Sequence, residues 1–301
     1  MSALTFENVG MTFPDGTVAL EGVSFGVREG EFVSVVGPSG CGKSTLLRIA
    51  SALERHTAGS CDVDGSKIGY VFQDATLLPW RTVRRNVELI AELSGIGGAE
   101  RERLAAETIQ LVGLQGFEDK YPRQLSGGMK MRASLARSLV MNPRTFLFDE
   151  PFGALDESLR EELGWEVRSI LSRRGTAAVL VTHDRHEALT LGDEVAVMEA
   201  GRIVQRGTPR EVYQSPASRF VAGFIAVSSY VPTADGGEVL VRPHEVRVVE
   251  GGPHTVERVE FLGPTHRYTV RTADGAALVA DVGPDIPLAV GSRCDVEVLA
   301  R

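Results

Sequence analysis

The sequence predicts a large α/β domain interrupted by a helical stretch, followed by a small all-β domain. Three observations lead to this. Apolar runs of strand length recur through about the first 225 residues, each followed by glycine, acidic residues or turn residues. Helical patterns replace them from about Thr76 to Leu139. From about Ser228, short strand-like runs alternate with glycine-containing turns.

Length and composition suit a globular protein with one large and one smaller domain. The chain has 301 residues, of which 43% are hydrophobic and 24% charged, as in proteins with an ordinary core. Its formal net charge of −8 argues against a broad nucleic-acid-binding face, which should be basic. No nucleic-acid partner is therefore expected.

Membrane and secretion signals are not apparent in the sequence. No apolar run approaches the roughly 20 residues that span a bilayer, and the start MSALTFENVG has no basic flank before an apolar stretch. The three cysteines, Cys41, Cys61 and Cys294, are odd in number and widely spaced, which suits a reducing cytosol. Any membrane role is therefore expected to come through partner chains.

The strand signals of the large domain are Glu31–Val36, Thr145–Phe148, Ala177–Val181 and Glu194–Met198. Between them, RRNVELIAELSG and ERERLAAETIQLVG have helical periodicity, and residues 76–139 are the expected place of an inserted helical subdomain. After the helical REVYQSPASRFVAGFIA, the pattern becomes β-rich. We therefore expect domains at 1–226 and 228–301.

A glycine-rich loop follows the apolar strand EFVSVV and precedes the helical LLRIASAL. It has the pattern G-x-x-x-x-G-K-[ST] of a phosphate-binding loop in its usual strand-loop-helix context. Backbone N–H groups, the helix start and a lysine can then hold the phosphates of ATP. The ATP-binding residues that this loop predicts are Gly37, Pro38, Ser39, Gly40, Cys41, Gly42, Lys43, Ser44 and Thr45.

Two adjacent carboxylates end the apolar strand TFLF. Asp149 is placed to hold Mg²⁺ together with Ser44, and Glu150 to polarise the attacking water as a general base. Two acids at a strand end can also be a solvated turn. Beside a phosphate-binding loop, the catalytic interpretation is favoured.

The motif Leu125-Ser-Gly-Gly-Met129 stands before the helical KMRASLARSLV. Here the chain resembles the ABC ATPase family, whose signature begins LSGG. Ser126 can cap the helix, and Gly127 and Gly128 leave its N-terminal N–H groups open to an anion. The resemblance implies that this anion is the γ-phosphate of ATP held by the other subunit of a dimer. Met129 and Met131 depart from the Gln or Arg of many relatives.

Further elements of that family stand in the expected order over about residues 3–226. By resemblance, Gln73 belongs to the glutamine loop. In the family this loop meets the metal site of the nucleotide and faces the membrane subunit. Asp156 belongs to the loop that crosses the dimer, and His183 is the switch histidine that contacts the γ-phosphate. Phe13 is the aromatic residue that stacks on adenine. Catalysis is thus assigned to Glu150, His183 and Gln73, with Mg²⁺ held by Ser44, Gln73 and Asp149.

Cys41 lies inside the phosphate-binding loop, at the start of a helix. Helix N-termini lower thiol pKa values, so Cys41 is expected to be unusually reactive unless it merely fills a variable loop position.

The resemblance implies the ATP-hydrolysing subunit of an importer at the cytoplasmic face of the membrane. Its partners would be a second ATPase subunit, two transmembrane permease subunits and an external solute-binding protein. VFQDATLLPWRTV is similar to importers for nitrate, sulfonates and taurine, which suggests a small anion as solute. PREVYQSPASRFVAGFIA and VRPHEV instead resemble the sugar, polyamine and sulfate importers, whose tails carry OB-like β domains of the TOBE type. A regulatory role for residues 228–301 follows from this resemblance.

Other classes are weighed against this interpretation. A chromosome-maintenance ATPase would place a long coiled coil between the phosphate-binding loop and LSGG, and a translation factor of this family would carry two cassettes. An exporter ATPase and a non-transport signalling ATPase remain alternatives. Co-purification with hydrophobic membrane subunits would distinguish a transport ATPase from a signalling ATPase.

Overall fold

The computed structural model describes residues 2–63, 68–233, 236–283 and 288–299. Its contacts separate the chain into two compact units, Met1–Ser215 and Pro216–Arg301. The sequence predicts a domain boundary near residue 226. That position lies one short helix after the boundary between these two units.

The first unit is built around a mixed sheet with the strand order β5-β6-β7-β3-β8-β9. Pairs from β5 to β8 run parallel, and β9 is antiparallel to β8. Parallel strands end at one sheet edge, so the loops after β3, β6 and β7 meet there. In chain order the strands are β3 (Phe32–Val36), β5 (Ile68–Val71), β6 (Thr145–Asp149), β7 (Ala177–Thr182), β8 (Glu194–Glu199) and β9 (Arg202–Gly207).

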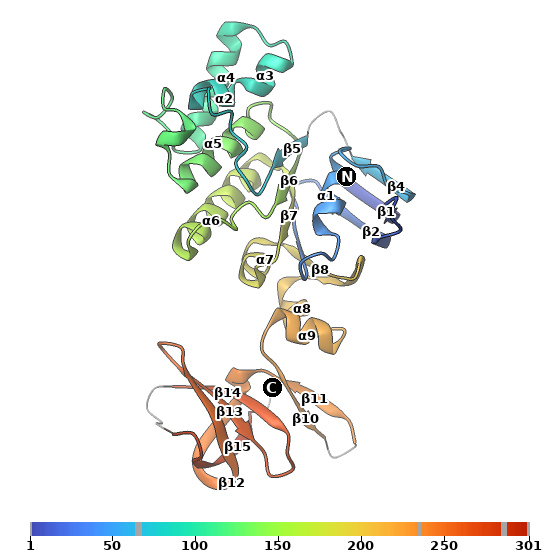
Figure 1. The fold of residues 1–301 in the computed structure, drawn as a ribbon, viewed down its shortest axis with the longest axis vertical. Coiled ribbons are helices and arrows are strands. Elements are labelled where there is room, and N and C mark those ends of the chain that lie inside the picture. The colour runs from blue at the N-terminus through green and yellow to red at the C-terminus, as the bar shows by residue number, and fades with distance from the viewer. Residues whose placement is uncertain (1, 64–67, 234–235, 284–287, 300–301) are drawn as a thin grey trace. The chain divides into compact units, whose positions relative to one another are not determined.

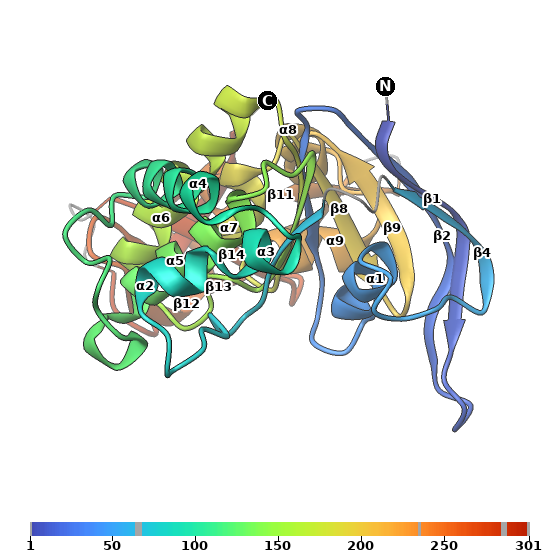
Figure 2. The ribbon, with the colours of Figure 1, turned by 90° about the horizontal axis from the view of Figure 1, so that it is seen from above.

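A second, antiparallel sheet in this unit has the order β2-β1-β4. Its strands are β1 (Ser2–Thr12), β2 (Val18–Arg28) and β4 (Ala58–Val63). In Figures 1 and 2 these strands lie on the α1 side of the parallel sheet, opposite α5 and α6. The parallel sheet is therefore covered on both faces, as its continuous apolar strands require.

Side chains alternate between the two faces of the parallel sheet and build two cores. On β6, Phe146 and Phe148 pack in the core shared with the helices, whereas Leu147 packs in the core shared with α1 and the small sheet. On β7, Leu180 packs in the core shared with the helices, and Val179 packs in the core shared with α1 and the small sheet. Burying one such side chain contributes about 1.5–3 kcal/mol.

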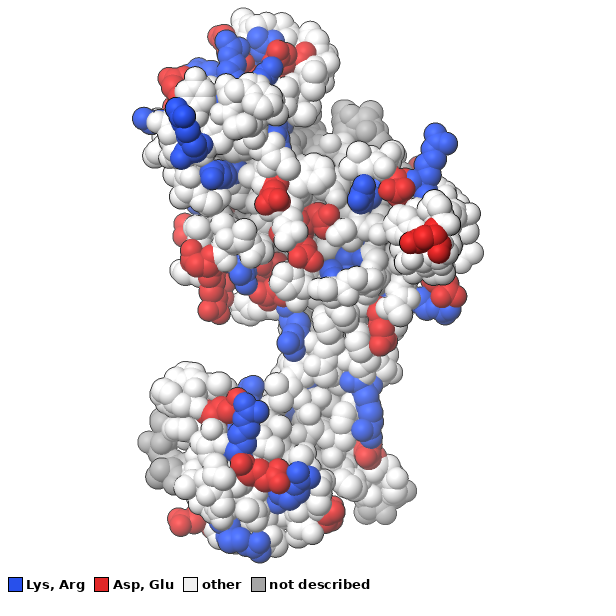
Figure 3. Space-filling model, in the orientation of Figure 1, with Lys and Arg blue, Asp and Glu red and all other residues white. Residues whose placement is uncertain are grey.

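The predicted helical stretch forms helices that pack around α5. The exposed face of α4 carries Arg103 paired with Glu100 and Glu107. Figure 3 shows acidic and basic side chains intermingled over this end of the unit. The helices of the unit are α1 (Lys43–Ala50), α2 (Val83–Val87), α3 (Leu89–Leu93), α4 (Gly98–Leu111), the 3-10 helix Pro122–Gln124, α5 (Gly127–Leu139), α6 (Glu157–Arg174), α7 (Arg185–Leu191) and α8 (Pro209–Gln214).

The second unit begins with α9 (Arg219–Ile225) and continues as strands, joined by the 3-10 helix Pro243–Glu245. Arg242 is 1% exposed and donates hydrogen bonds to the carbonyl oxygens of Ala222, Ala226 and Val227 at the end of α9. The sheets have the orders β10-β11 and β14-β13-β12-β15. Their strands are β10 (Ser229–Pro232), β11 (Glu238–Val241), β12 (Val246–Phe261), β13 (His266–Arg271), β14 (Ala277–Val282) and β15 (Arg293–Val298).

None of the described helices combines the length and the apolarity needed to cross a bilayer.

Candidate active site

The glycine-rich loop connects β3 to α1 and needs glycine at two positions. A Cβ atom on Gly37 would lie 2.2 Å from the carbonyl oxygen of Met198, on the neighbouring strand β8. Gly42 has φ +102° and caps α1, and a Cβ there would lie 2.3 Å from the carbonyl oxygen of Ala19. Neither contact is sterically possible. The glycines thus let the loop pass close to β8 and β2.

Lys43 lies under this loop and is 4% exposed. Its Nζ atom donates hydrogen bonds to the carbonyl oxygens of Gly37 (2.8 Å) and Pro38 (2.9 Å). These contacts hold the ammonium group at the loop, where it can meet an anion. Ser44 and Thr45 follow on the first turn of α1.

Asp149, at the end of β6, meets two hydroxyl groups. Oγ of Ser44 donates to its Oδ1 (2.7 Å), and the phenolic oxygen of Tyr70 donates to its Oδ2 (3.2 Å). Burial, with the charge of Asp149 beside it, raises the pKa of Tyr70, so Tyr70 stays a proton donor. Tyr70 was not singled out in the sequence, because nothing local to it indicates contact with β6.

The oxygens of Ser44 and Asp149 fit a magnesium ion. Mg²⁺ prefers oxygen ligands and usually binds through one or two carboxylates plus phosphates and water, not a closed protein cage. The described residues contain no group of three or more His, Cys, Asp or Glu that could hold a metal.

Glu150 follows Asp149 and pairs with His183, which follows β7. Oε2 of Glu150 lies 2.8 Å from Nδ1 of His183, a hydrogen bond if that nitrogen carries the proton. Glu150 has φ +48°, a conformation uncommon for residues other than glycine, which costs about 1–3 kcal/mol. Such strain is typical of residues held for a function.

A cleft of about 280 Å³ brings several of the predicted residues together. Phe13, part of the loop between β1 and β2, is half-buried and lines the cleft together with Glu150. An aromatic ring, a phosphate-binding loop and a carboxylate in one cleft suit a nucleotide. The cleft is lined by Phe13, Thr17, Val18, Ala19, Ser39, Gly40, Gly42, Lys43, Ser44, Thr45 and Glu150.

The signature residues and Asp156 do not line this cleft. Ser126 caps α5 by accepting from the N–H of Met129 (3.3 Å), and Asp156 caps α6 by accepting from the N–H of Leu159 (3.0 Å). Leu159 also covers Gly128, where a Cβ atom would lie 2.8 Å away. The two helix starts therefore form one surface of their own.

Gln73 is exposed and follows β5, which is paired with β6. The next residues are held from α5 by Arg137, which is 8% exposed. Its guanidinium donates to the carbonyl oxygens of Ala75 (3.1 Å) and Thr76 (2.8 Å). Burial lowers the pKa of Arg137. The sequence did not predict this link between α5 and the segment after Gln73, because α5 and β5 are distant in sequence.

The expectation of a lowered thiol pKa at Cys41 is wrong. Cys41 is 6% exposed and packs in the core near Met198. Burial raises the pKa of its thiol, and the neighbouring charge of Lys43 and a backbone hydrogen bond only partly offset that. The thiol is therefore largely protonated at neutral pH.

Cys41 should accordingly react slowly with maleimides. At pH 7 we expect modification of the folded protein at least about tenfold slower than in denaturant, because the thiolate is the nucleophile. Mass spectrometry of the labelled peptide measures both rates. Rapid labelling of the folded chain, prevented by Mg-ATP, would contradict the buried position.

Comparisons with known proteins agree with this geometry. A family model described as ABC transporter matches residues 20–153, and one described as TOBE domain matches residues 239–301. The sulfate/thiosulfate import ATP-binding protein CysA 2 of Chromobacterium violaceum is 44% identical, over 94% of this chain and 89% of its own length. The spermidine/putrescine import ATP-binding protein PotA of Thermobifida fusca is 38% identical, over 92% and 85%.

The Fe(3+) ions import ATP-binding protein FbpC of Streptomyces coelicolor is 39% identical, over 98% of this chain and 95% of its own length. These relatives agree with the likeness of the C-terminal segment to the polyamine and sulfate branch. The nitrate, sulfonate and taurine group, which the segment around Gln73 resembles, is not represented among them.

Solved structures match about two thirds of the chain. A dimeric post-hydrolysis state of the ATP-binding cassette MJ0796 with ADP and Pi is 33% identical, with a TM-score of 0.62, over 69% of this chain and 99% of that one. The cbiO1 structure from Clostridium perfringens is 28% identical, with a TM-score of 0.66, over 70% and 90%.

Proposed function

Because the chain belongs to the ATP-binding subunits of ABC importers, ATPases with a C-terminal TOBE domain, we propose that it hydrolyses ATP at the cleft described above to drive uptake of a small solute. The observation that carries this proposal is the meeting of Lys43, the Ser44–Asp149 pair and the Glu150–His183 pair at one sheet edge. Each group has a distinct task in phosphoryl transfer.

Phe13 stacks on the adenine, and the loop of residues 37–45 with Lys43 binds the phosphates. Ser44 and Asp149 would hold Mg²⁺, with Gln73 as a further ligand, and the ion would supply positive charge that offsets the charge of the phosphates. Glu150 takes a proton from the attacking water as general base. His183 holds the Glu150 carboxylate and contacts the γ-phosphate.

The site becomes complete in a dimer. Ser126, Gly127 and Gly128 form the start of α5, whose N–H groups suit an anion, but they lie outside the cleft of their own chain. A second subunit would present them to the γ-phosphate, with Asp156 in the loop beside them. ATP then bridges the closed pair and ADP does so poorly, which makes closure depend on hydrolysis.

The closed pair acts on two permease subunits at the cytoplasmic face of the membrane, with an external binding protein delivering the solute. Residues 228–301 serve as a regulatory or dimer-supporting module. We propose a small anion as the solute, which the 44% identity to a sulfate/thiosulfate import protein supports. The solute is selected by partner chains, so uptake assays with those partners decide its identity.

Trp80 offers a direct test of the coupling. Its side chain is 71% exposed, and it lies in the segment from Gln73 to Trp80 that would face the permease. Exposed tryptophans are frequent anchors of interfaces. Trp80→Ala should lower co-purification with co-expressed permease subunits by about tenfold and leave the ATPase rate of the isolated chain unchanged.

Trp165→Ala is the matched control, because that tryptophan is 54% exposed on α6. It should leave co-purification intact. A wild-type chain that never associates with any permease pair would favour the signalling alternative.

A further inference from the structure

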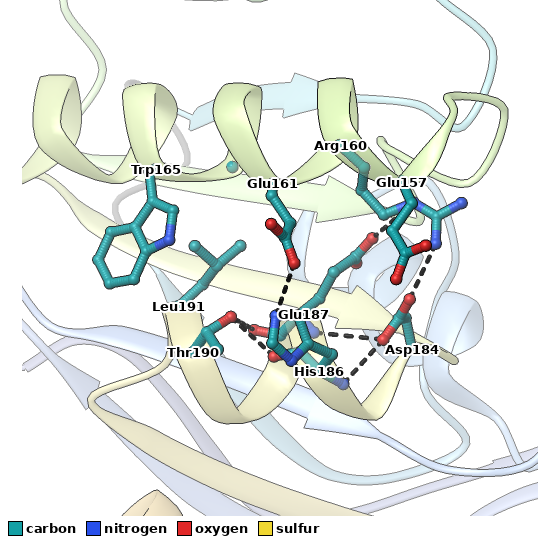
Figure 4. A pocket seen from close by; sticks show the side chains of 10 residues that line it. Glu157, Arg160, Glu161, Trp165, Asp184, His186, Glu187, Thr190 and Leu191 are labelled. Atoms are coloured by element: carbon teal, nitrogen blue, oxygen red, sulfur yellow. Dashed lines mark hydrogen bonds and ion pairs between the residues drawn. The ribbon is translucent and has the colours of Figure 1, made fainter. Parts of the chain in front are cut away.

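Arg160, near the start of α6, contacts both the loop that ends at Asp156 and the turn that carries His183. Its Nη2 atom donates to the carbonyl oxygen of Leu155 (2.9 Å), the residue before Asp156. Its Nη1 atom donates to Oδ2 of Asp184 (2.9 Å), the residue after His183. Figure 4 shows the guanidinium group of Arg160 beside the carboxylate of Asp184. One side chain thus links two loops of the site.

Asp184 fixes the turn after His183. Its Oδ1 accepts hydrogen bonds from the backbone N–H groups of His186 (2.7 Å) and Glu187 (3.3 Å), which caps α7. Burial raises the pKa of Asp184, but these hydrogen bonds and Arg160 outweigh burial and leave the pKa below its usual value. Asp184 therefore stays ionised and paired with Arg160.

The residue on the other side of His183 belongs to the same network. Oγ1 of Thr182 accepts from the N–H of Asp184 (2.9 Å) and donates to Oε2 of the buried Glu187 (2.6 Å). The other carboxylate oxygen of Glu187 lies 3.6 Å from Nε of Arg160. That Nε is buried and has no hydrogen-bond partner among the described residues. A small shift of α6 toward α7 would complete this contact.

Space for such a shift is present. A cavity of about 50 Å³ lies between α6 and α7, with Arg160, Asp184 and Glu187 in its wall. Elsewhere along its wall the helices touch, since a Cβ atom on Gly164 would lie 3.0 Å from Leu191. The helices are thus in close contact at Gly164 and joined by polar contacts at Arg160.

We propose that Arg160 is a positioning residue that makes the placement of His183 depend on the conformation of the loop ending at Asp156. The inference rests on the proposed function, in which a second subunit contacts that loop. Movement of the Leu155 carbonyl would move Arg160, and with it Asp184 and the imidazole of His183 relative to Glu150. Hydrolysis would then proceed only when the partner subunit is in place.

Arg160→Ala should lower kcat for ATP hydrolysis by about ten- to a hundredfold, because small misplacements of a catalytic group have effects of this size. The Kd for ATP should stay within about twofold, since Arg160 does not line the cleft. The matched control is Arg168→Ala. Arg168 lies on the same helix, is equally exposed at 25%, and joins α6 to the Leu191 carbonyl and to Asp193. It should keep wild-type kcat.

A double-mutant cycle separates positioning from general stabilisation. If Arg160 acts through His183, Arg160→Ala should have no further effect in a His183→Ala background, measured as single-turnover release of radiolabelled phosphate over hours. Independent, multiplying effects of the two substitutions would overturn the inference, and so would wild-type hydrolysis by His183→Ala. A wild-type chain without ATPase activity would instead overturn the proposed function.

Arg160→Lys provides a variant that keeps the charge. Lysine can pair with Asp184 but lacks the planar fork that reaches Leu155 at the same time. An intermediate kcat, with the melting temperature of wild type, is expected. Wild-type kcat in Arg160→Lys would show that charge beside Asp184 suffices, and the link to the loop would be refuted.

Discussion

Glu150→Gln should reduce ATP hydrolysis by about 10²–10⁴-fold, the usual contribution of a general base. ATP binding should persist, because the glutamine amide has nearly the shape of the carboxylate and can either accept from or donate to Nδ1 of His183. With ATP bound and not hydrolysed, the two subunits should remain associated. Size-exclusion chromatography with Mg-ATP measures the dimer, and phosphate release measures turnover.

Glu102→Gln serves as the control, since Glu102 is an exposed residue of α4. Wild-type turnover in Glu150→Gln would remove Glu150 from the role of base. Loss of ATP binding in a folded Glu150→Gln protein would show that the Glu150 carboxylate also serves to shape the cleft.

Lys43→Ala should strongly weaken ATP binding. The side chain supplies a full positive charge to the phosphates and also ties Gly37 and Pro38 together. A charge-assisted hydrogen bond contributes about 1.5–3 kcal/mol, so losing it weakens ATP binding by about ten- to a hundredfold or more. Equilibrium binding of a fluorescent ATP analogue gives the Kd.

Lys120→Ala is the comparison for Lys43→Ala, because Lys120 is exposed and its side chain lies outside the cleft. It should bind ATP as wild type does. Unchanged affinity in Lys43→Ala would mean that backbone N–H groups alone hold the phosphates. Melting curves separate lost binding from lost folding.

Much of the fold could be predicted because its signals are local. The runs at Thr145–Phe148 and Ala177–Val181 became β6 and β7, since a strand buried on both faces must be apolar throughout. The loop of residues 37–45 was recognisable because glycine, lysine and serine stand at fixed spacing. The likeness of the fold to solved cassettes agrees with that interpretation.

The remaining features depend on residues that are distant in the chain. The hydroxyl of Tyr70 reaches Asp149 only because β5 pairs with β6, and Arg160 reaches Asp184 only because α6 packs on α7. The hydrophobic periodicity of the sequence cannot predict such contacts. For Cys41, the local rule of helix starts suggested a reactive thiol, but the packing of Met198 on the loop decided its environment.

Arg242 indicates where C-terminal domains could be exchanged between importers, by recombination or in engineered chimaeras. Its buried guanidinium is held by carbonyl oxygens at the end of α9, so helix and β-rich tail depend on each other. A junction at Val227 would combine Arg242 with a foreign helix, and a buried cation that loses its acceptors is strongly destabilising. A junction before Pro216 would transfer α9 and Arg242 together, so the buried guanidinium would keep its acceptors.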